Sequence, residues 1–466
     1  MMRMGNAIDD KGDLNGRIEY LTDGRLKKIT LRSTAGSNKA TREFFYQDTN
    51  SSHAYVASKN THLRKTLDKK QAGTVICSSE YDLDPTGNRL GRTDQDGKYD
   101  AWSYDPNQQL RAESRWSAKT PGTLSYRTEY GYDGNGNRTV MFEDGVKVAY
   151  TIGNNNEMTE AGADDITYDF YGNTVFITGT NSYELAYDYQ RHLMEMYENE
   201  SLVFRAEYDG NGRRMRVEYN GSGIWTNFVH CELTGEILAE YTLVSSTFTI
   251  KCLNTYGLGL ISSNRESTKR YFHFDGLGST VALTDASENI TDTYVYSAFG
   301  NLLSSTGSSV NPYMYVGQWG YYDDGAMGCQ FDMLLLGVRY YVPAYGRFFT
   351  WDPMPAVNLY DYTRNSPTMM IDPSGTWPGY GNYCGPRTSH LEPVDKVDQC
   401  CKVHDACLKG LKEWSNPLIK RRCQCQLCMC LLAAPCGKFD LKCRLAQTLM
   451  LAWACLGCAD PVHMPI

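Results

Sequence analysis

The chain has 466 residues, too many for one hydrophobic core, since single cores rarely grow past roughly 250 to 300 residues. Hydrophobic residues make up 41% of it, which excludes a disordered chain, and no apolar run approaches the roughly 18 residues that span a bilayer. The net charge of −8 comes without a dense basic stripe, so we expect no nucleic-acid partner. Residues 1 to 11 lack an apolar segment, and we therefore expect no secretory signal on this chain.

Tyr-Asp pairs recur at irregular spacings through the first half of the chain, and Gly-Asn or Gly-Arg usually follows within a few residues. The pairs are Tyr81-Asp82, Tyr104-Asp105, Tyr132-Asp133, Tyr168-Asp169, Tyr187-Asp188 and Tyr208-Asp209. Each unit predicts two strands joined by a turn that Asp and Gly supply. A single hairpin cannot bury a face, so we expect successive hairpins to join one sheet with their tyrosines packed inward.

A series of ordered motifs follows the repeats, between residues 271 and 376. It includes Tyr271-Phe-His-Phe-Asp275-Gly-Leu-Gly278, Gly337-Val-Arg339-Tyr340-Tyr341, Gly346-Arg347-Phe348-Phe349 and Asp352-Pro353. The repeats and these motifs resemble the YD repeats and the repeat-associated core of RHS and teneurin-type proteins. The resemblance implies a β-rich shell of spiralling antiparallel hairpins over residues 1–260, closed by a core plug over residues 261–376, and a variable toxin domain inside it.

In that family the core can act as an aspartyl protease that cuts the chain just after its last motif. The motif here is Asp372-Pro373-Ser374-Gly375-Thr376, with Thr in place of the usual Leu. The resemblance makes Asp352 and Asp372 the candidate carboxylates, one holding a proton while the other activates water. Asp-Pro is also an ordinary turn opener, so a purely structural role for both residues stays open.

The composition changes after residue 376. Residues 377–466 hold twelve of the sixteen cysteines and a net charge of +4, from 11 Lys and Arg against 7 Asp and Glu. From Val394 to Leu411 the apolar residues and cysteines follow helical spacing. Cys400, His404 and Cys407 share one face of that helix. We expect a small, all-α, disulfide-rich domain here.

The segment Cys400-Cys401-x-x-His404-Asp405-x-Cys407, with the loop Tyr383-Cys384-Gly385 before it, resembles the secreted phospholipase A2 family. The resemblance implies a Ca²⁺ held by the backbone carbonyls of Tyr383, Gly385 and Arg387 and by the Asp405 carboxylate. It makes His404 the general base for hydrolysis of a phospholipid ester at a membrane surface. The cysteines that it makes disulfide candidates are Cys384, Cys400, Cys401, Cys407, Cys423 and Cys430.

One departure concerns the aspartate that in this family orients the histidine. Two registers of the second helix place either Gln424 or Gln426 in that position, and Asp440 is a distant substitute. An amide can hold the imidazole tautomer but cannot stabilise the imidazolium. An impaired phospholipase scaffold on a shell or adhesion protein is therefore the alternative function. Cys423, Cys425, Cys428 and Cys430 leave a zinc site open as a second alternative.

Together the two resemblances imply an RHS-type toxin whose C-terminal domain is a calcium-dependent phospholipase A2-like esterase. Such a protein is secreted or delivered by a specialised secretion system, and an immunity protein is the protein partner that the resemblance suggests. Because a reducing cytosol keeps crowded thiols unpaired, we expect the terminal domain to become active only after it reaches an oxidising compartment.

Overall fold

The computed structural model describes residues 16–20, 26–32, 38–46, 63–84, 87–232, 234–354 and 356–376. The chain divides into two compact units. The first consists of Met1–Trp351 and Tyr360–Gly375, and the second of Asp352–Leu359 and Thr376–Ile466. The predicted effector domain, residues 377–466, lies outside the described residues. No helix in the described part of the chain has the length and apolar character to cross a bilayer.

Most described residues of the first unit belong to one 26-stranded sheet. Its strands are β1 (Gly16–Tyr20), β2 (Leu26–Arg32), β3 (Asn38–Tyr46), β4 (Leu63–Lys69), β5 (Val75–Leu83), β6 (Arg89–Asp94), β7 (Tyr99–Tyr104), β8 (Leu110–Trp116), β9 (Leu124–Tyr132), β10 (Arg138–Glu143), β11 (Val146–Ile152), β12 (Met158–Ala161), β13 (Asp164–Tyr168), β14 (Thr174–Thr178), β15 (Ser182–Tyr187), β16 (Leu193–Glu198), β17 (Ser201–Tyr208), β18 (Arg214–Tyr219), β19 (Thr226–His230), β20 (Ile237–Val244), β21 (Thr247–Gly257), β22 (Gly259–Arg265), β23 (Thr268–Phe274), β24 (Thr280–Thr284), β25 (Ile290–Tyr296) and β26 (Leu302–Thr306).

A smaller, four-stranded sheet follows it in the chain. It contains β27 (Tyr322–Asp323), β28 (Leu334–Leu336), β29 (Arg339–Val342) and β30 (Arg347–Phe348). Short 3-10 helices lie at η1 (Asn154–Asn156), η2 (Gly317–Trp319), η3 (Gly325–Met327) and η4 (Thr363–Asn365). The predicted core plug, residues 261–376, includes the last strands of the large sheet. From here on we call only residues 311–351 and 360–375, which follow that sheet within the first unit, the plug.

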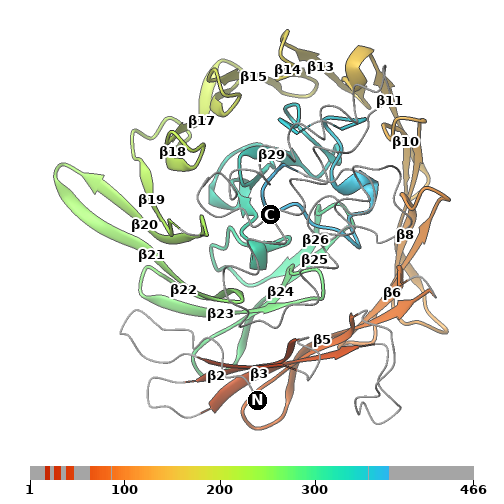
Figure 1. The fold of residues 1–466 in the computed structure, drawn as a ribbon, viewed down its shortest axis with the longest axis vertical. Helices are drawn as coiled ribbons and strands as arrows, with labels where there is room; N and C mark the ends of the chain where they lie inside the picture. The colour runs from red at the N-terminus through yellow and green to blue at the C-terminus, as the bar shows by residue number, and fades with distance from the viewer. Residues whose placement is uncertain are drawn as a thin grey trace, which may run out of the picture. The chain divides into compact units, whose positions relative to one another are not determined.

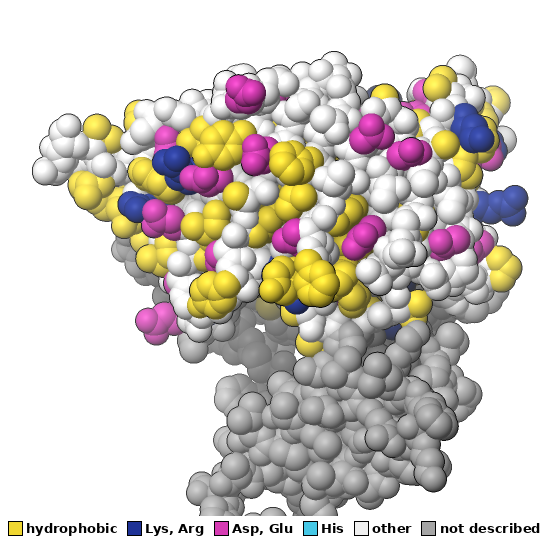
Figure 2. Space-filling model, turned by 90° about the horizontal axis from the view of Figure 1, so that it is seen from above, with side chains coloured by type: hydrophobic (Ala, Val, Ile, Leu, Met, Phe, Trp, Pro, Cys, Tyr) yellow, Lys and Arg dark blue, Asp and Glu magenta, His cyan; other side chains and the backbone are white. Residues whose placement is uncertain are grey.

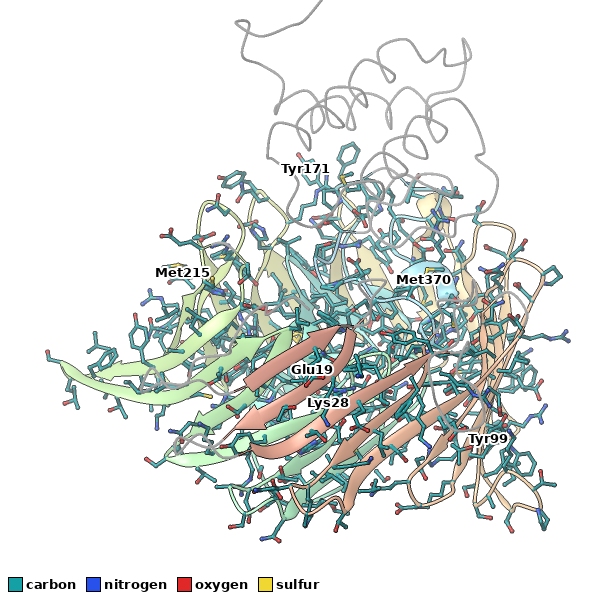
Figure 3. All side chains as sticks on the ribbon, turned by 60° about the horizontal axis from the view of Figure 1, so that its bottom comes forward. Glu19, Lys28, Tyr99, Tyr171, Met215 and Met370 are labelled. Carbon is teal, nitrogen blue, oxygen red and sulfur yellow. The ribbon has the colours of Figure 1, made fainter. Side chains whose placement is uncertain are left out.

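The large sheet is a continuous meander. Each strand pairs antiparallel with its neighbours in the chain, from β1 with β2 to β25 with β26. Glu19 and Lys28, labelled in Figure 3, stand directly opposite one another on the first two strands. We call this 26-stranded sheet the strip. Within the first unit the strip curves around the plug, as Figure 1 shows. The β-rich antiparallel shell predicted from the repeats is confirmed.

An aspartate closes the hairpin turns in one recurring way. At Asp133, the side-chain Oδ1 accepts the backbone N–H groups of Asn135 and Asn137, at 2.9 and 2.8 Å. A side chain of the turn itself thus satisfies two of the turn's backbone donors. The same pair of bonds forms at Asp105, Asp169, Asp188, Asp209 and Asp285. The Asp of the Tyr-Asp repeat is thus a structural residue.

The first Tyr-Asp pair departs from this pattern. Tyr81 and Asp82 both lie within β5, and the turn aspartate is Asp84, whose Oδ1 accepts the backbone N–H of Asn88 at 2.9 Å. Asp82 instead accepts a hydrogen bond from the Tyr99 hydroxyl at 2.9 Å. The sequence offers two aspartates two residues apart here. Asp82 is still paired within the sheet, opposite Gly91, whereas Asp84 follows the end of β5 and so reaches the turn.

The repeat tyrosines connect each strand to the one before it. The Tyr132 hydroxyl donates to the Leu110 carbonyl and the Tyr208 hydroxyl to the Leu193 carbonyl, both at 2.8 Å. Tyr104 and Tyr168 make the equivalent bonds to Arg89 and Met158. A buried tyrosine needs such an acceptor for its hydroxyl. The expected inward packing, with the hydroxyl at a polar position, is confirmed at these residues.

The core forms where the strip packs on the plug. Phe204 of β17 packs edge-on against Tyr340 of β29, with ring centroids 5.7 Å apart. Phe228 of β19 packs on Tyr322 of β27 at the same separation. These rings are buried, and each such aromatic pair stabilises the fold by roughly 0.5–1.5 kcal/mol beyond its area burial. Aromatic side chains of the strands, many of them tyrosines, therefore form the core between the strip and the plug.

Candidate functional site

The plug is tied to successive hairpins of the strip, and these contacts position its end. The Asn365 side-chain amide donates to the Gly136 carbonyl at 2.6 Å, and Thr174 N–H donates to the Phe349 carbonyl at 3.0 Å. The Arg89 guanidinium donates to the Thr368 carbonyl at 2.8 Å. The last residues of the plug therefore have a defined place within the first unit.

The plug ends in the predicted cleavage motif, and Asp372 lies at its centre. Asp372 is buried, and its backbone N–H donates to the Tyr321 hydroxyl at 2.6 Å. The Ser374 hydroxyl donates to the Asp372 carboxylate at 3.1 Å, and Gly375 N–H donates to the Asp372 carbonyl at 3.2 Å. These bonds form a tight turn, from which the chain continues after Gly375.

Arg339 of β29 holds this turn from the other side. Its Nε donates to the Gly375 carbonyl, and its Nη2 lies 3.7 Å from Asp372 Oδ2. The guanidinium also stacks on the Phe348 ring, 3.6 Å from its centroid. Gly375 has φ +63° and approaches the Leu336 carbonyl so closely that a Cβ has no room. Only glycine fits this position, so the motif's glycine has a packing reason.

Asp352, the second predicted carboxylate, belongs to the other compact unit. Its Oδ1 accepts the Met354 N–H at 2.8 Å, and its own N–H donates to the Leu359 carbonyl at 2.7 Å. These contacts are those of a turn. The pairing of Asp352 with Asp372 stays a prediction, and so does the self-cleavage that depends on it.

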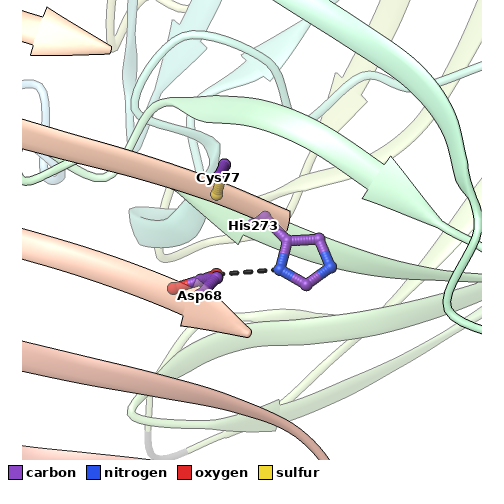
Figure 4. A group of neighbouring side chains, drawn as sticks. All are labelled: Asp68, Cys77 and His273. Atoms are coloured by element: carbon purple, nitrogen blue, oxygen red, sulfur yellow. Dashed lines mark hydrogen bonds and ion pairs between the residues drawn. The ribbon is translucent and has the colours of Figure 1, made fainter. Parts of the chain in front are cut away.

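A second cluster of chemically capable side chains is buried within the strip, where its early and late strands meet (Figure 4). Asp68 comes from β4, Cys77 from β5 and His273 from β23. The His273 Nδ1 lies 2.8 Å from Asp68 Oδ2, and its Nε2 lies 3.0 Å from the Thr284 hydroxyl. The possible ligand atoms of the three residues all lie within 4.8 Å of one another.

The donor set of this cluster, thiol, imidazole and carboxylate, is one that Zn²⁺ accepts. A positive charge is already present, because Arg42 Nε lies 3.6 Å from Asp68 Oδ1. Burial, and after it the charge of Asp68, raises the pKa of the Cys77 thiol well above its usual value, so the sulfur keeps its proton. Both ring nitrogens of His273 are engaged. The arrangement favours a structural connection between distant strands.

Sequence reasoning missed this cluster, since His273 and Asp68 are 205 positions apart and the motif that contains His273 indicates the fold of the core rather than a partner for the histidine. The residues predicted for the phospholipase site all lie outside the described residues, and their roles stay predictions. They are His404, Asp405, Tyr383, Gly385, Arg387, Gln424 and Gln426, with the cysteines Cys384, Cys400, Cys401, Cys407, Cys423 and Cys430.

The family model described as Teneurin YD-shell matches residues 101–372. A Tc holotoxin pore of Photorhabdus luminescens is similar in structure over 84% of this chain and 22% of its own, with a TM-score of 0.56 and 17% identity. This likeness supports the fold of the strip and the plug.

Two curated relatives differ in their named activities. The tRNA3(Ser)-specific nuclease WapA of Bacillus spizizenii is 30% identical over 267 residues, which are 53% of this chain and 11% of that protein. A phospholipase A2 of Calliactis polypus is 35% identical over 89 residues, which cover 14% of this chain and 54% of that enzyme. The chain thus spans about a tenth of the length of its nuclease relative. Because that relative is named for acting on a tRNA, the comparison does not support our expectation that nucleic acid is not a partner.

Proposed function

The chain belongs to the Teneurin YD-shell family, and from this premise we propose that it is a toxin-type shell protein that carries a calcium-dependent phospholipase A2-like esterase in residues 377–466. One observation carries the proposal. The segment from Cys400 to Cys407 has the cysteine, histidine and aspartate spacing of secreted phospholipases, and a phospholipase A2 is among the relatives. We assign that likeness to the cysteine-rich end of the chain because this segment lies there.

The proposed donor set is all oxygen: the carbonyls of Tyr383, Gly385 and Arg387 and the carboxylate of Asp405. A hard cation such as Ca²⁺ prefers these donors over nitrogen or sulfur. When bound, Ca²⁺ supplies positive charge that stabilises the ester oxygen and the substrate phosphate. The Gly385 N–H donates a further hydrogen bond to the developing oxyanion.

His404 is the proposed general base. A neutral imidazole takes the proton from a water molecule as that water attacks the ester carbonyl. Gln424 or Gln426 then orients the ring but contributes no negative charge, so turnover is low. In serine proteases, replacing the carboxylate that orients the catalytic histidine by an amide lowers kcat by a factor of about 10⁴.

The proposed place of the shell in this function is to hold the esterase until delivery. The described turn at Gly375 ends the plug immediately before the proposed effector. The proposed effector therefore begins directly after the turn at Gly375, whose position within the first unit is defined by its hydrogen bonds. Delivery to a target cell and neutralisation by an immunity protein are the remaining parts of the proposal.

The test is fatty-acid release from mixed phosphatidylcholine and phosphatidylglycerol vesicles by the full oxidised chain, with Ca²⁺ and with chelator. We expect weak, calcium-dependent release that His404→Gln abolishes and that His390→Gln, a histidine outside the motif, leaves unchanged. Asp405→Asn removes the calcium response. A carboxylate restored by Gln424→Asp or Gln426→Asp raises turnover in only one of the two variants.

A second candidate is a nuclease, favoured by the WapA relative alone. The same preparation is therefore incubated with total tRNA. If the preparation cleaves tRNA and does not hydrolyse lipid, the terminal domain is a nuclease and not an esterase. No activity together with one tightly bound zinc per chain favours the zinc-binding alternative.

A further inference from the structure

The hairpin of β20 and β21 extends past both of its neighbours. β19 pairs with β20 only as far as Thr226 opposite Thr242, and β22 reaches β21 only from Arg265 opposite Cys252. Residues 243–250 therefore form a two-stranded ribbon, which projects to the left in Figure 1 and again in Figure 3. Two strands alone are marginally stable in water, so a ribbon of this kind gains from a partner.

The outer face of this ribbon is apolar. Tyr241 stands opposite Ile250 and Leu243 opposite Phe248, and strand alternation places all four side chains on one face. Leu243, Phe248 and Ile250 are 60%, 59% and 50% exposed. The segment from 241 to 250 contains no charged residue. In Figure 2 the lobe furthest to the left, which is this ribbon, is correspondingly yellow and white at its end.

The open edge of the ribbon also has backbone groups directed away from β20. The hairpin loop is Ser245-Ser246, with φ of 47° and 67°, so Val244 and Thr247 form the closing hydrogen-bonded pair. Hydrogen-bonded and non-bonded pairs alternate from there, and Phe248 and Ile250 direct N–H and C=O outward. Within the described ranges no strand covers that side of residues 247–250. Residues 247–250 contain no lysine or proline; the register shift of β21, at Lys251, comes only at the base of the ribbon.

We propose that this hairpin pairs with the same hairpin of a second copy of the chain, β21 against β21, antiparallel about a two-fold axis at Thr249. In that register Phe248 of one copy faces Ile250 of the other. These are the residues whose backbone groups point outward, so the two copies satisfy one another's edges. The apolar outer faces of the two ribbons join into one four-stranded face.

A second copy fits this edge better than a lipid surface or a charged partner. An open strand edge in hydrocarbon leaves its N–H and C=O groups unsatisfied, at several kcal/mol each. The ribbon has no charge by which a charged protein is selected. Each ribbon has only ten residues, from 241 to 250, so the contact is smaller than the roughly 20–30 residues on each side of a stable interface. The dimer is therefore weak and reversible.

Sedimentation velocity of the full chain across a range of concentrations tests the association. We expect a concentration-dependent shift from 52.6 kDa toward twice that mass. Phe248→Lys and Ile250→Pro, which removes an outward N–H, each weaken the association at least tenfold. Val146→Lys, a change at a 69% exposed residue of β11, is the matched control and leaves it unchanged. A monomer at every concentration overturns the proposal.

Cysteine cross-linking tests the register. Thr249 pairs with itself across the axis at a non-hydrogen-bonded position, where Cα atoms are about 4.5 Å apart, within disulfide range. Under mild oxidation Thr249→Cys gives a disulfide between two copies of the peptide around residue 249, identified by mass spectrometry, and Thr247→Cys gives none. Equal cross-linking by both overturns this pairing. So does a monomer that sediments with phosphatidylglycerol vesicles only when Phe248 is present.

Discussion

Arg214 of β18 and Asp324, the residue before η3, form an ion pair shielded from water. Arg214 Nη1 lies 2.8 and 2.7 Å from the two Asp324 oxygens, and the side chains are 1% and 0% exposed. The Tyr219 hydroxyl donates to the same carboxylate, and Arg214 Nη1 also donates to the Tyr340 hydroxyl at 2.8 Å. This pair connects the strip to the plug across 110 positions of sequence.

Asp324→Asn leaves the Arg214 charge buried without its counter-charge. We expect the free energy of unfolding of the first unit to fall by about 3–5 kcal/mol. Urea-induced unfolding followed by tryptophan fluorescence measures it. Glu207→Gln, which breaks the ion pair of Glu207 and Arg216 on the surface, is the control and costs less than about 1 kcal/mol. Equal costs for the two substitutions contradict a special role for the buried pair.

Glu113 of β8 makes the stability of the shell depend on pH. Burial raises the pKa of Glu113 to about 7, despite hydrogen bonds from the Tyr130 hydroxyl at 2.5 Å and Ala298 N–H at 2.6 Å. The folded state therefore holds this proton more tightly than the unfolded chain, whose carboxyl titrates near 4.5. The stabilisation is complete below pH 4.5 and is lost as the pH rises through 7.

The difference corresponds to about 3 kcal/mol, at 1.36 kcal/mol for each pKa unit. Unfolding free energies measured between pH 5 and 8 fall with pH for this reason, and Glu113→Gln flattens the decline. Asp323, whose pKa burial also raises to about 7, contributes with the same sign, so a smaller slope remains. Glu143→Gln, at an exposed residue, serves as control. An unchanged slope in Glu113→Gln refutes this assignment.

The contact of Asp68 with His273 connects β4 to β23, two strands of the strip that are far apart in the sequence. A double-mutant cycle with Asp68→Asn and His273→Gln has an expected coupling of roughly 1–3 kcal/mol in unfolding free energy. The pair Asp68→Asn and Glu80→Gln, where Glu80 is a more exposed residue of β5, has little coupling. Zinc that copurifies with the chain and is lost in Cys77→Ser would instead make the cluster a metal centre.

We expect scission after about Thr376, which would separate the proposed effector from the plug. Denaturing mass spectrometry of the purified chain then detects two fragments in place of the 52.6 kDa species. Asp372→Asn and Asp352→Asn each leave the chain intact, because an aspartyl pair needs both carboxyls. An intact wild-type chain excludes the cleavage and leaves Asp372 as the centre of a turn.

We expect the redox state of the twelve terminal cysteines to control the proposed esterase. Each missing disulfide removes roughly 2–4 kcal/mol from a domain of about 90 residues, whose total stability is of order 5–15 kcal/mol. The chain purified from a reducing cytosol is then inactive and gains activity on oxidation. Thiol titration before and after oxidation, with the vesicle assay in parallel, checks this. Full activity with all thiols free is the opposing result.

The sequence by itself determined the local architecture of the shell. The turn at Asp133 is closed by bonds to Asn135 and Asn137, only two and four residues on, so the pattern of Asp and Gly is sufficient to predict it. Tyr132 reaches back to Leu110 of the adjacent strand, which is again a consequence of hairpin geometry. The meander follows, because each hairpin buries its face only by joining the next.

Tertiary structure alone decided which distant groups meet. The end of β5 at Leu83 selected Asp84 over Asp82 as the turn residue, and no local signal pairs Asp324 with Arg214. His273 meets Asp68 because the strip curves until strands 205 residues apart come into contact, and that curvature sums small twists over many strands. A buried charge is stable only beside its counter-charge. The sequence shows which residues are charged, but only the fold determines which of them lie close together.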